Sequence, residues 1–173
     1  MTMFFYLSAA VAVLSTLMVI TRVNAVHALL YLIVSLLSVA LIFFVLGAPF
    51  VAALEVIIYA GAIMVLFVFV IMILNLDARA AKLETQWLAP ETWVGPSLLT
   101  AVLFGEFLYL ITAHGGRLYA VSEVGPKQVG ISLLGPYLLG VELASLLLLA
   151  GLVGAYHLGR GSAPAMGKGE DTR

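Results

Sequence analysis

The sequence contains no cysteine and few charged residues. Of its 173 residues, 10% are charged, with 8 Lys and Arg against 9 Asp and Glu. The missing cysteine excludes disulfides, thiolate nucleophiles, thioether-attached haem, cysteine-ligated iron–sulfur clusters and cysteine-type zinc sites. The net charge of -1 gives no basic field that would attract nucleic acid. Any redox chemistry linked to this chain must therefore reside in a partner.

Hydrophobic residues make up most of what is present. They account for 64% of the chain, and the mean hydropathy is +1.18. Soluble domains are typically about 45–50% apolar and about 25% charged. A soluble protein of this composition would lack the polar surface needed to cover itself, so the composition is that of a membrane protein.

Five apolar runs are long enough to cross a membrane. A bilayer core about 30 Å thick requires about 20 apolar residues in a helix. The runs cover residues 3–20, 25–46, 50–76, 94–113 and 137–158. The sequence therefore predicts an all-α integral membrane protein, with five transmembrane helices forming a domain over residues 1–158 and Pro96 in the first turn of the fourth helix. Residues 159–173, rich in small and charged residues, predict a loose polar tail.

The distribution of basic residues predicts the orientation. The side that holds the first loop, the third loop and the C-terminus carries six basic residues, and the other side carries only Arg117 and Lys127. The six are Arg22, Arg79, Lys82, Arg160, Lys168 and Arg173. Basic loops stay in the cytoplasm, which places the C-terminus there and the N-terminus outside. The first run has no basic segment before it and no small-x-small site at its end, so it predicts a retained helix and no cleaved signal peptide.

Three carboxylates fall within the predicted spans, namely Glu55, Glu106 and Glu142. A charge at the bilayer centre costs about 2.5 to about 17 kcal/mol, so each acid needs a partner, water or a proton. Glu106 lies deepest in its span, whereas the other two lie about one and a half turns from an interface. Each acid is a candidate for a polar or proton path. Glu55 and Glu142 could equally reach the headgroups or pair with a neighbouring helix, and Glu106 could instead bond to an adjacent helix.

The three histidines predict no metal site. His27 and His157 lie near the cytoplasmic ends of spans, and His114 lies at the opposite edge. None has a second histidine or a carboxylate at ligand spacing. We interpret all three as interfacial residues, and no residue of the chain is predicted to be catalytic or to bind a cofactor.

The third predicted span is too long for a straight perpendicular helix. Its 27 residues would extend about 40 Å, which requires tilt, a break or a change of helix type. Glu55 and Tyr59 are four residues apart and share a face. Gly61, flanked by Ala60 and Ala62, removes side-chain bulk near the middle of the membrane. Periodicity leaves three alternatives open for this stretch: close helix packing, water entry, or a π-bulge.

A second seam on the same span begins at Gly61 and continues through Val65, Val68 and Met72 at helical spacing. In the last span, Ala150, Gly151, Gly154 and Ala155 form two overlapping small-xxx-small pairs. Such surfaces favour close contact with another helix. We therefore expect the helices to be covered largely by other chains.

Two stretches resemble a known family. Residues 59–67, YAGAIMVLF, are similar to the third helix of the subunit J family of bacterial NADH-quinone oxidoreductase, whose mitochondrial counterpart is subunit 6 of respiratory complex I. Residues 142–155, ELASLLLLAGLVGA, resemble that family's last helix. The number of spans, the length and the orientation also fit over the whole chain.

This resemblance implies a core membrane subunit of a proton-pumping NADH-quinone oxidoreductase in the bacterial inner membrane. The chain itself would be non-catalytic, and FMN, the iron–sulfur clusters and quinone would be bound by partner subunits. In the family, the third helix interconverts between straight α and a π-bulge, which gates a water-filled path. Carried over to this sequence, Tyr59 lines the path, Gly61 permits the bulge, and Val65 and Met72 form its hydrophobic closure. Nothing in the resemblance assigns a role to Glu106.

Two alternatives remain open from the sequence. The chain could be a related subunit of a multisubunit cation/proton antiporter or a membrane-bound hydrogenase, where helices of this kind recur. It could also be a purely structural packing subunit, in which the acids and Tyr59 only hold neighbouring helices together.

Overall fold

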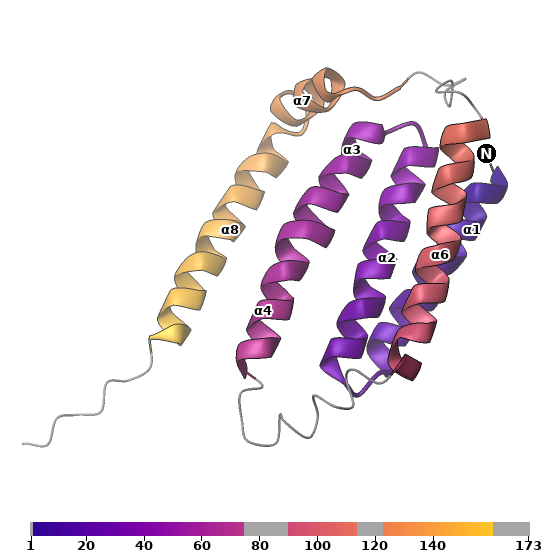
Figure 1. Cartoon of the computed structure of the whole chain (residues 1–173). Helices are drawn as coiled ribbons and strands as arrows, with labels where there is room; N and C mark the ends of the chain where they lie inside the picture. The colour runs from indigo at the N-terminus through magenta and orange to yellow at the C-terminus, as the bar shows by residue number, and fades with distance from the viewer. Residues whose placement is uncertain (1, 75–89, 114–122, 161–173) are drawn as a thin grey trace, which may run out of the picture. The chain divides into compact units, whose positions relative to one another are not determined.

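The computed structural model describes residues 2–74, 90–113 and 123–160 (Figure 1). Every regular element over these ranges is helical. Five helices are long and apolar enough to cross a membrane, which confirms the predicted all-α fold with five transmembrane helices. The chain divides into two compact units, Met1–Gly125 and Pro126–Arg173, which are described one at a time.

The first unit begins with two antiparallel helices, α1 (Thr2–Thr21) and α2 (Ala25–Val45). Asn24 starts the second of them, because its side-chain oxygen accepts a hydrogen bond from the Val26 amide at 2.9 Å. An asparagine at this position satisfies one of the amides that the first turn of a helix leaves free. The short turn keeps the two helices packed against each other along their length.

Helix α2 ends at a glycine in the left-handed conformation. Gly47 has a φ of 84°, which only glycine adopts without strain. The Ala48 amide donates to the Phe43 carbonyl at 3.0 Å, and the Gly47 amide donates to the Phe44 carbonyl at 3.1 Å. This pair of bonds is the Schellman arrangement, and it reverses the chain into the third span.

The third span is a continuous rod with a π-helical middle. It comprises α3 (Pro49–Leu54), the π-helix η1 (Glu55–Ile63) and α4 (Met64–Leu74). Pro49 suits the first helical turn, where no amide hydrogen is required. The irregular third helix predicted from its length is confirmed. The π segment covers Glu55–Ile63 and so includes Gly61 with its two flanking alanines, where the sequence left a π-bulge open.

The fourth span is α6 (Pro90–Ala113), which packs against both α1 and α2. Its core contacts join one residue of α1, two of α2 and two of α6, namely Val11, Val34, Leu41, Leu103 and Leu110. The prediction that Pro96 lies in the first turn is wrong, because the helix begins at Pro90 and Pro96 lies inside it. A proline at that depth has no amide hydrogen to donate to the carbonyl four residues earlier.

The second unit contains α7 (Pro126–Leu134) and α8 (Leu138–Gly159). Between them the chain turns through Gly135, with the Tyr137 amide donating to the Ser132 carbonyl at 3.1 Å. Helix α8 is the fifth predicted span, whereas no helix was expected over the residues of α7. The predicted tail over residues 159–173 lies outside the described residues beyond position 160.

Candidate functional site

The π segment changes the hydrogen-bond partners of the third span. At its end, the Met64 amide donates to the carbonyl of Tyr59, five residues earlier, as well as to that of Gly61. Partners five residues apart define π geometry, whereas an α-helix pairs residues four apart. The segment is nine residues long. Most π-helices are single-turn bulges, and they occur frequently at functional sites.

Gly61 fits this backbone because it has no side chain. A Cβ atom at this position would lie 3.1 Å from the carbonyl oxygen of Val56, five residues earlier. That separation is tighter than ordinary van der Waals contact, so any other residue would push against a backbone carbonyl that belongs to the π turn. The glycine therefore removes a steric obstacle to the π form.

The side chains beside Gly61 are open to a neighbour. Tyr59 is 49% exposed, and Glu55 is partly buried. Over the described ranges, neither side chain makes a hydrogen bond or an ion pair. Because they are four residues apart in the same helix, a carboxylate and a phenol lie available to a partner chain or to water.

The predicted closure residues lie on α4. Val65 is 65% exposed and Val68 is also exposed. Met72 belongs to α4, but its side chain lies outside the described part of the structure. The neighbouring Met64 is 1% exposed, so its side chain is packed inside the unit. Sequence periodicity did not single out Met64, since every residue around it is equally apolar.

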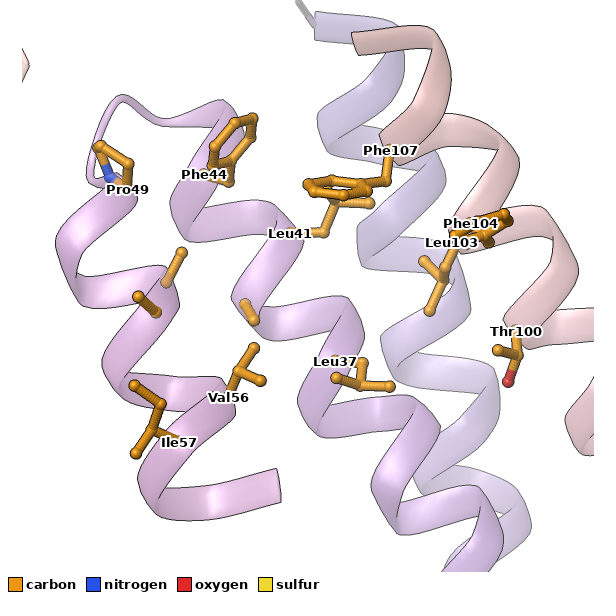
Figure 2. Close-up of a pocket in the computed structure, with 13 residues that line it drawn as sticks. Leu37, Leu41, Phe44, Pro49, Val56, Ile57, Thr100, Leu103, Phe104 and Phe107 are labelled. Carbon is orange, nitrogen blue, oxygen red and sulfur yellow. The ribbon is translucent and has the colours of Figure 1, made fainter. Parts of the chain in front are cut away.

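An apolar pocket of about 510 Å³ lies between α2, the α3–η1 region and α6 (Figure 2). Phe104 and Phe107 from α6 lie on one side, and Val56 and Ile57 from η1 lie on the other. The Phe44 and Phe107 rings pack edge to face with centroids 5.9 Å apart. None of the predicted site residues lines this pocket, and its lining offers no group suited to acid–base chemistry.

Glu106 lies in the core between α1 and α6. It is 5% exposed, and its Oε1 atom accepts a hydrogen bond of 2.9 Å from the Ser8 hydroxyl of α1. The carbonyl of Ser8 in turn accepts a bond of 2.6 Å from the Ser38 hydroxyl of α2. The other carboxylate oxygen, Oε2, is buried and has no partner among the described residues. The Ser8 bond joins Glu106 to a neighbouring helix, which is one of the alternatives that the sequence left open.

The three predicted acids lie on three different helices. Glu55 is in η1 and Glu106 is in α6, and no hydrogen bond or ion pair joins them in the described ranges. Glu142 belongs to the second unit, where it lies on α8 and its carbonyl accepts a 2.8 Å bond from the Ser145 hydroxyl. Each acid must therefore be considered with its own surroundings.

Two of the three histidines lie in the described residues, one in each unit. His27 lies in the first turn of α2, and its Nε2 atom is buried without a partner in the described ranges. His157 is exposed in the last turn of α8, and His114 lies outside the described residues. Among the residues that the structure describes, no three His, Asp or Glu side chains gather to hold a metal ion.

The sequence of this chain was compared with families and with known proteins, and both comparisons find relatives. The family described as NADH-ubiquinone/plastoquinone oxidoreductase chain 6 matches residues 15–158. NADH-quinone oxidoreductase subunit J of Pseudomonas aeruginosa is 59% identical over 160 residues, covering 92% of this chain and 96% of the relative. NADH-quinone oxidoreductase subunit J of Escherichia coli K12 is 53% identical over 156 residues, covering 90% of this chain and 85% of the relative.

Proposed function

The chain belongs to the NADH-ubiquinone/plastoquinone oxidoreductase chain 6 family, and we propose that it works as a membrane subunit of NADH-quinone oxidoreductase that gates proton translocation. Membership of the family makes other subunits of that complex its partners and the bacterial inner membrane its location. We further propose that residues 1–158 form the membrane domain, with the N-terminus outside and the C-terminus in the cytoplasm.

The observation that carries the proposal is the π-helix over Glu55–Ile63 with Gly61 inside it. A π segment can return to α geometry by exchanging hydrogen-bond partners, without breaking the helix. Gly61 leaves room for the Val56 carbonyl in the π form, and Tyr59, in the same segment, offers an exposed phenol. We propose that Tyr59 lines a water path, and that Val65 and Met72 close it when the helix changes form.

The chain contributes no catalytic group in this scheme. FMN, the iron–sulfur clusters and quinone belong to partner subunits, which fits a sequence without cysteine. The chain's own contribution is to control where water and protons pass. Glu55, Glu106 and Glu142 are the acids through which a polar path could connect to neighbouring subunits.

The test replaces Gly61 with Val and, separately, Tyr59 with Phe in the assembled complex. We expect quinone reduction by NADH to continue while proton pumping per NADH falls to less than half, because the π form is obstructed or the path loses its hydroxyl. Gly105→Val is the matched control, since a Cβ at Gly105 meets nothing within 4 Å. Full pumping by both the Gly61 and Tyr59 variants would remove the gating role.

The same variants separate gating from a purely structural role. A packing residue would lose assembly and pumping in parallel, whereas a gate variant assembles normally and fails to pump. Native gel electrophoresis of the membranes measures assembly independently of activity. If NADH oxidation and quinone reduction did not co-purify with the chain, the alternative of an antiporter or hydrogenase subunit would take its place.

A further inference from the structure

Glu106 is a buried acid that the gating proposal does not explain. It lies on the α1-facing side of α6, while the gate lies in the third span, on the part of the unit that packs against α2. Along α6 it is 7 residues from Ala113, or about 10 Å inside the nearer end of the helix. It is nevertheless 5% exposed, so its carboxyl group is surrounded by protein.

Within the described residues, no positive charge lies close to Glu106. Its helix packs against α1 and α2, and the titratable and charged groups of those two helices and the turn between them are Tyr6, Arg22, His27 and Tyr31. Arg22 is 14 residues from Ser8, about 21 Å along the helix, and His27 is 11 residues from Ser38, about 16 Å away. An ionised carboxylate at Glu106 would therefore be compensated by a single serine hydroxyl, which is far too little in a buried membrane site.

The free oxygen of Glu106 needs a partner in either protonation state. If Oε2 carries the proton, the hydroxyl is a buried donor without an acceptor, and if it does not, the atom is a buried acceptor without a donor. Buried polar groups are almost always hydrogen-bonded, to protein or to an ordered water. Ser15 Oγ and His27 Nε2, in the same α1–α2 pair, are also buried without a partner among the described residues.

We propose that Glu106, Ser8 and Ser38 form a protonation site distinct from the gate, in which Glu106 is held neutral and binds water at its free oxygen. Ser8 donates to Oε1, and Ser38 fixes Ser8 by donating to its carbonyl at 2.6 Å. The two serines thereby hold one carboxylate oxygen in place and leave the other for water. The site is separate from the π segment and stands whether or not that segment gates.

The experiment uses the intact complex that contains this chain. Infrared difference spectra between H2O and D2O at neutral pH detect the C=O stretch of protonated carboxyl groups that exchange with water. We expect Glu106→Gln to remove one such band, and Ser8→Ala to shift the same band to higher frequency because its C=O group loses a hydrogen bond. Ser145→Ala is the control, since in the described structure its hydroxyl donates to the Glu142 carbonyl of its own helix.

Identical difference spectra for wild type and Glu106→Gln would overturn the proposal, because the carboxyl would be ionised or sealed from water. Should Glu106→Gln fail to assemble, Ser8→Ala still decides the matter, because it keeps the acid and changes only its hydrogen bond. A band that does not shift in Ser8→Ala would show that Ser8 does not hold this carboxyl, and would equally overturn the site.

Discussion

At the scale of single residues, Gly95, like Gly61, occupies a position where a Cβ atom would meet a neighbouring group. A Cβ at Gly95 would clash with the hydroxyl of Tyr31, which is buried between α2 and α6. The Tyr31 side chain is 8% exposed, and the Arg22 guanidinium lies 5.6 Å from its ring centroid, so a shift of the ring would disturb packing that is already formed. The glycine thus allows α6 to approach α2 closely near its first turns.

We predict that Gly95→Ala destabilises the protein by about 1–3 kcal/mol, the usual cost of an overpacked core. Tyr31→Phe in the same background should recover most of the loss, because it removes the clashing hydroxyl. The midpoint temperature of the complex, measured for both variants and for Gly105→Ala, checks this. Equal midpoints for Gly95→Ala and Gly105→Ala would show that the contact with Tyr31 is not limiting.

The sequence predicted some of these residues and missed others for a physical reason. Gly61 stood out because a glycine between two alanines in a long apolar span is a local feature. Gly95 and Ser8 did not stand out, since their roles depend on Tyr31 and Glu106, which are distant in the chain. Glu106 could be recognised as a buried acid, but its serine partner is 98 positions away and no periodicity connects them.

At the scale of elements, local residues mark both ends of α2. Asn24 caps its start, and Gly47 turns the chain after its end. Helix α6 begins at Pro90, four residues before the predicted apolar run, so Pro90 and not Pro96 lies in its first turn. Span length required some irregularity in the third helix and left a π-bulge as one possibility, but the extent of the π segment depends on backbone packing that a sequence of uniformly apolar residues does not record.

The cap at Asn24 gives a prediction for one element. Asn24→Ala should cost about 1 kcal/mol, which corresponds to roughly fivefold faster amide exchange in the first turn of α2. Asn24→Ser should keep the slow rate, since a serine hydroxyl can accept the same bond from Val26. Hydrogen–deuterium exchange with mass spectrometry on the peptide covering this turn makes the measurement. A slow rate in Asn24→Ala would mean that the side chain does not hold the turn.

At the scale of the whole molecule, much of the apolar surface is exposed. On α4 alone, Val65, Leu66 and Phe67 are each more than half exposed in the described structure. Hydrophobic surface of this extent suits lipid or other helices, in agreement with a subunit of a larger membrane assembly. The 64% hydrophobic composition therefore serves contacts outside the chain as much as its own small core.

The orientation can be tested on the whole chain because it contains no cysteine. A single Ser162→Cys should react with a membrane-impermeant maleimide only in inverted vesicles, since the positive-inside rule places the C-terminus in the cytoplasm. Glu123→Cys, before the last span, should react only in intact spheroplasts. Reaction of the two variants from the opposite sides would reverse the proposed topology.

A change of the π segment to α geometry would also rotate the part of the third span that follows it. In a helix each residue turns the chain by about 100° and advances it by about 1.5 Å. If η1 changed to α geometry by shifting its hydrogen bonds by one residue, α4 would rotate by about 100° and advance by only about 1.5 Å. Val65 would then leave one neighbour and a side chain from a different side of α4 would replace it. A shift of a few backbone hydrogen bonds would thus rotate α4 about its axis, and this rotation would change which residues of α4 face each neighbour.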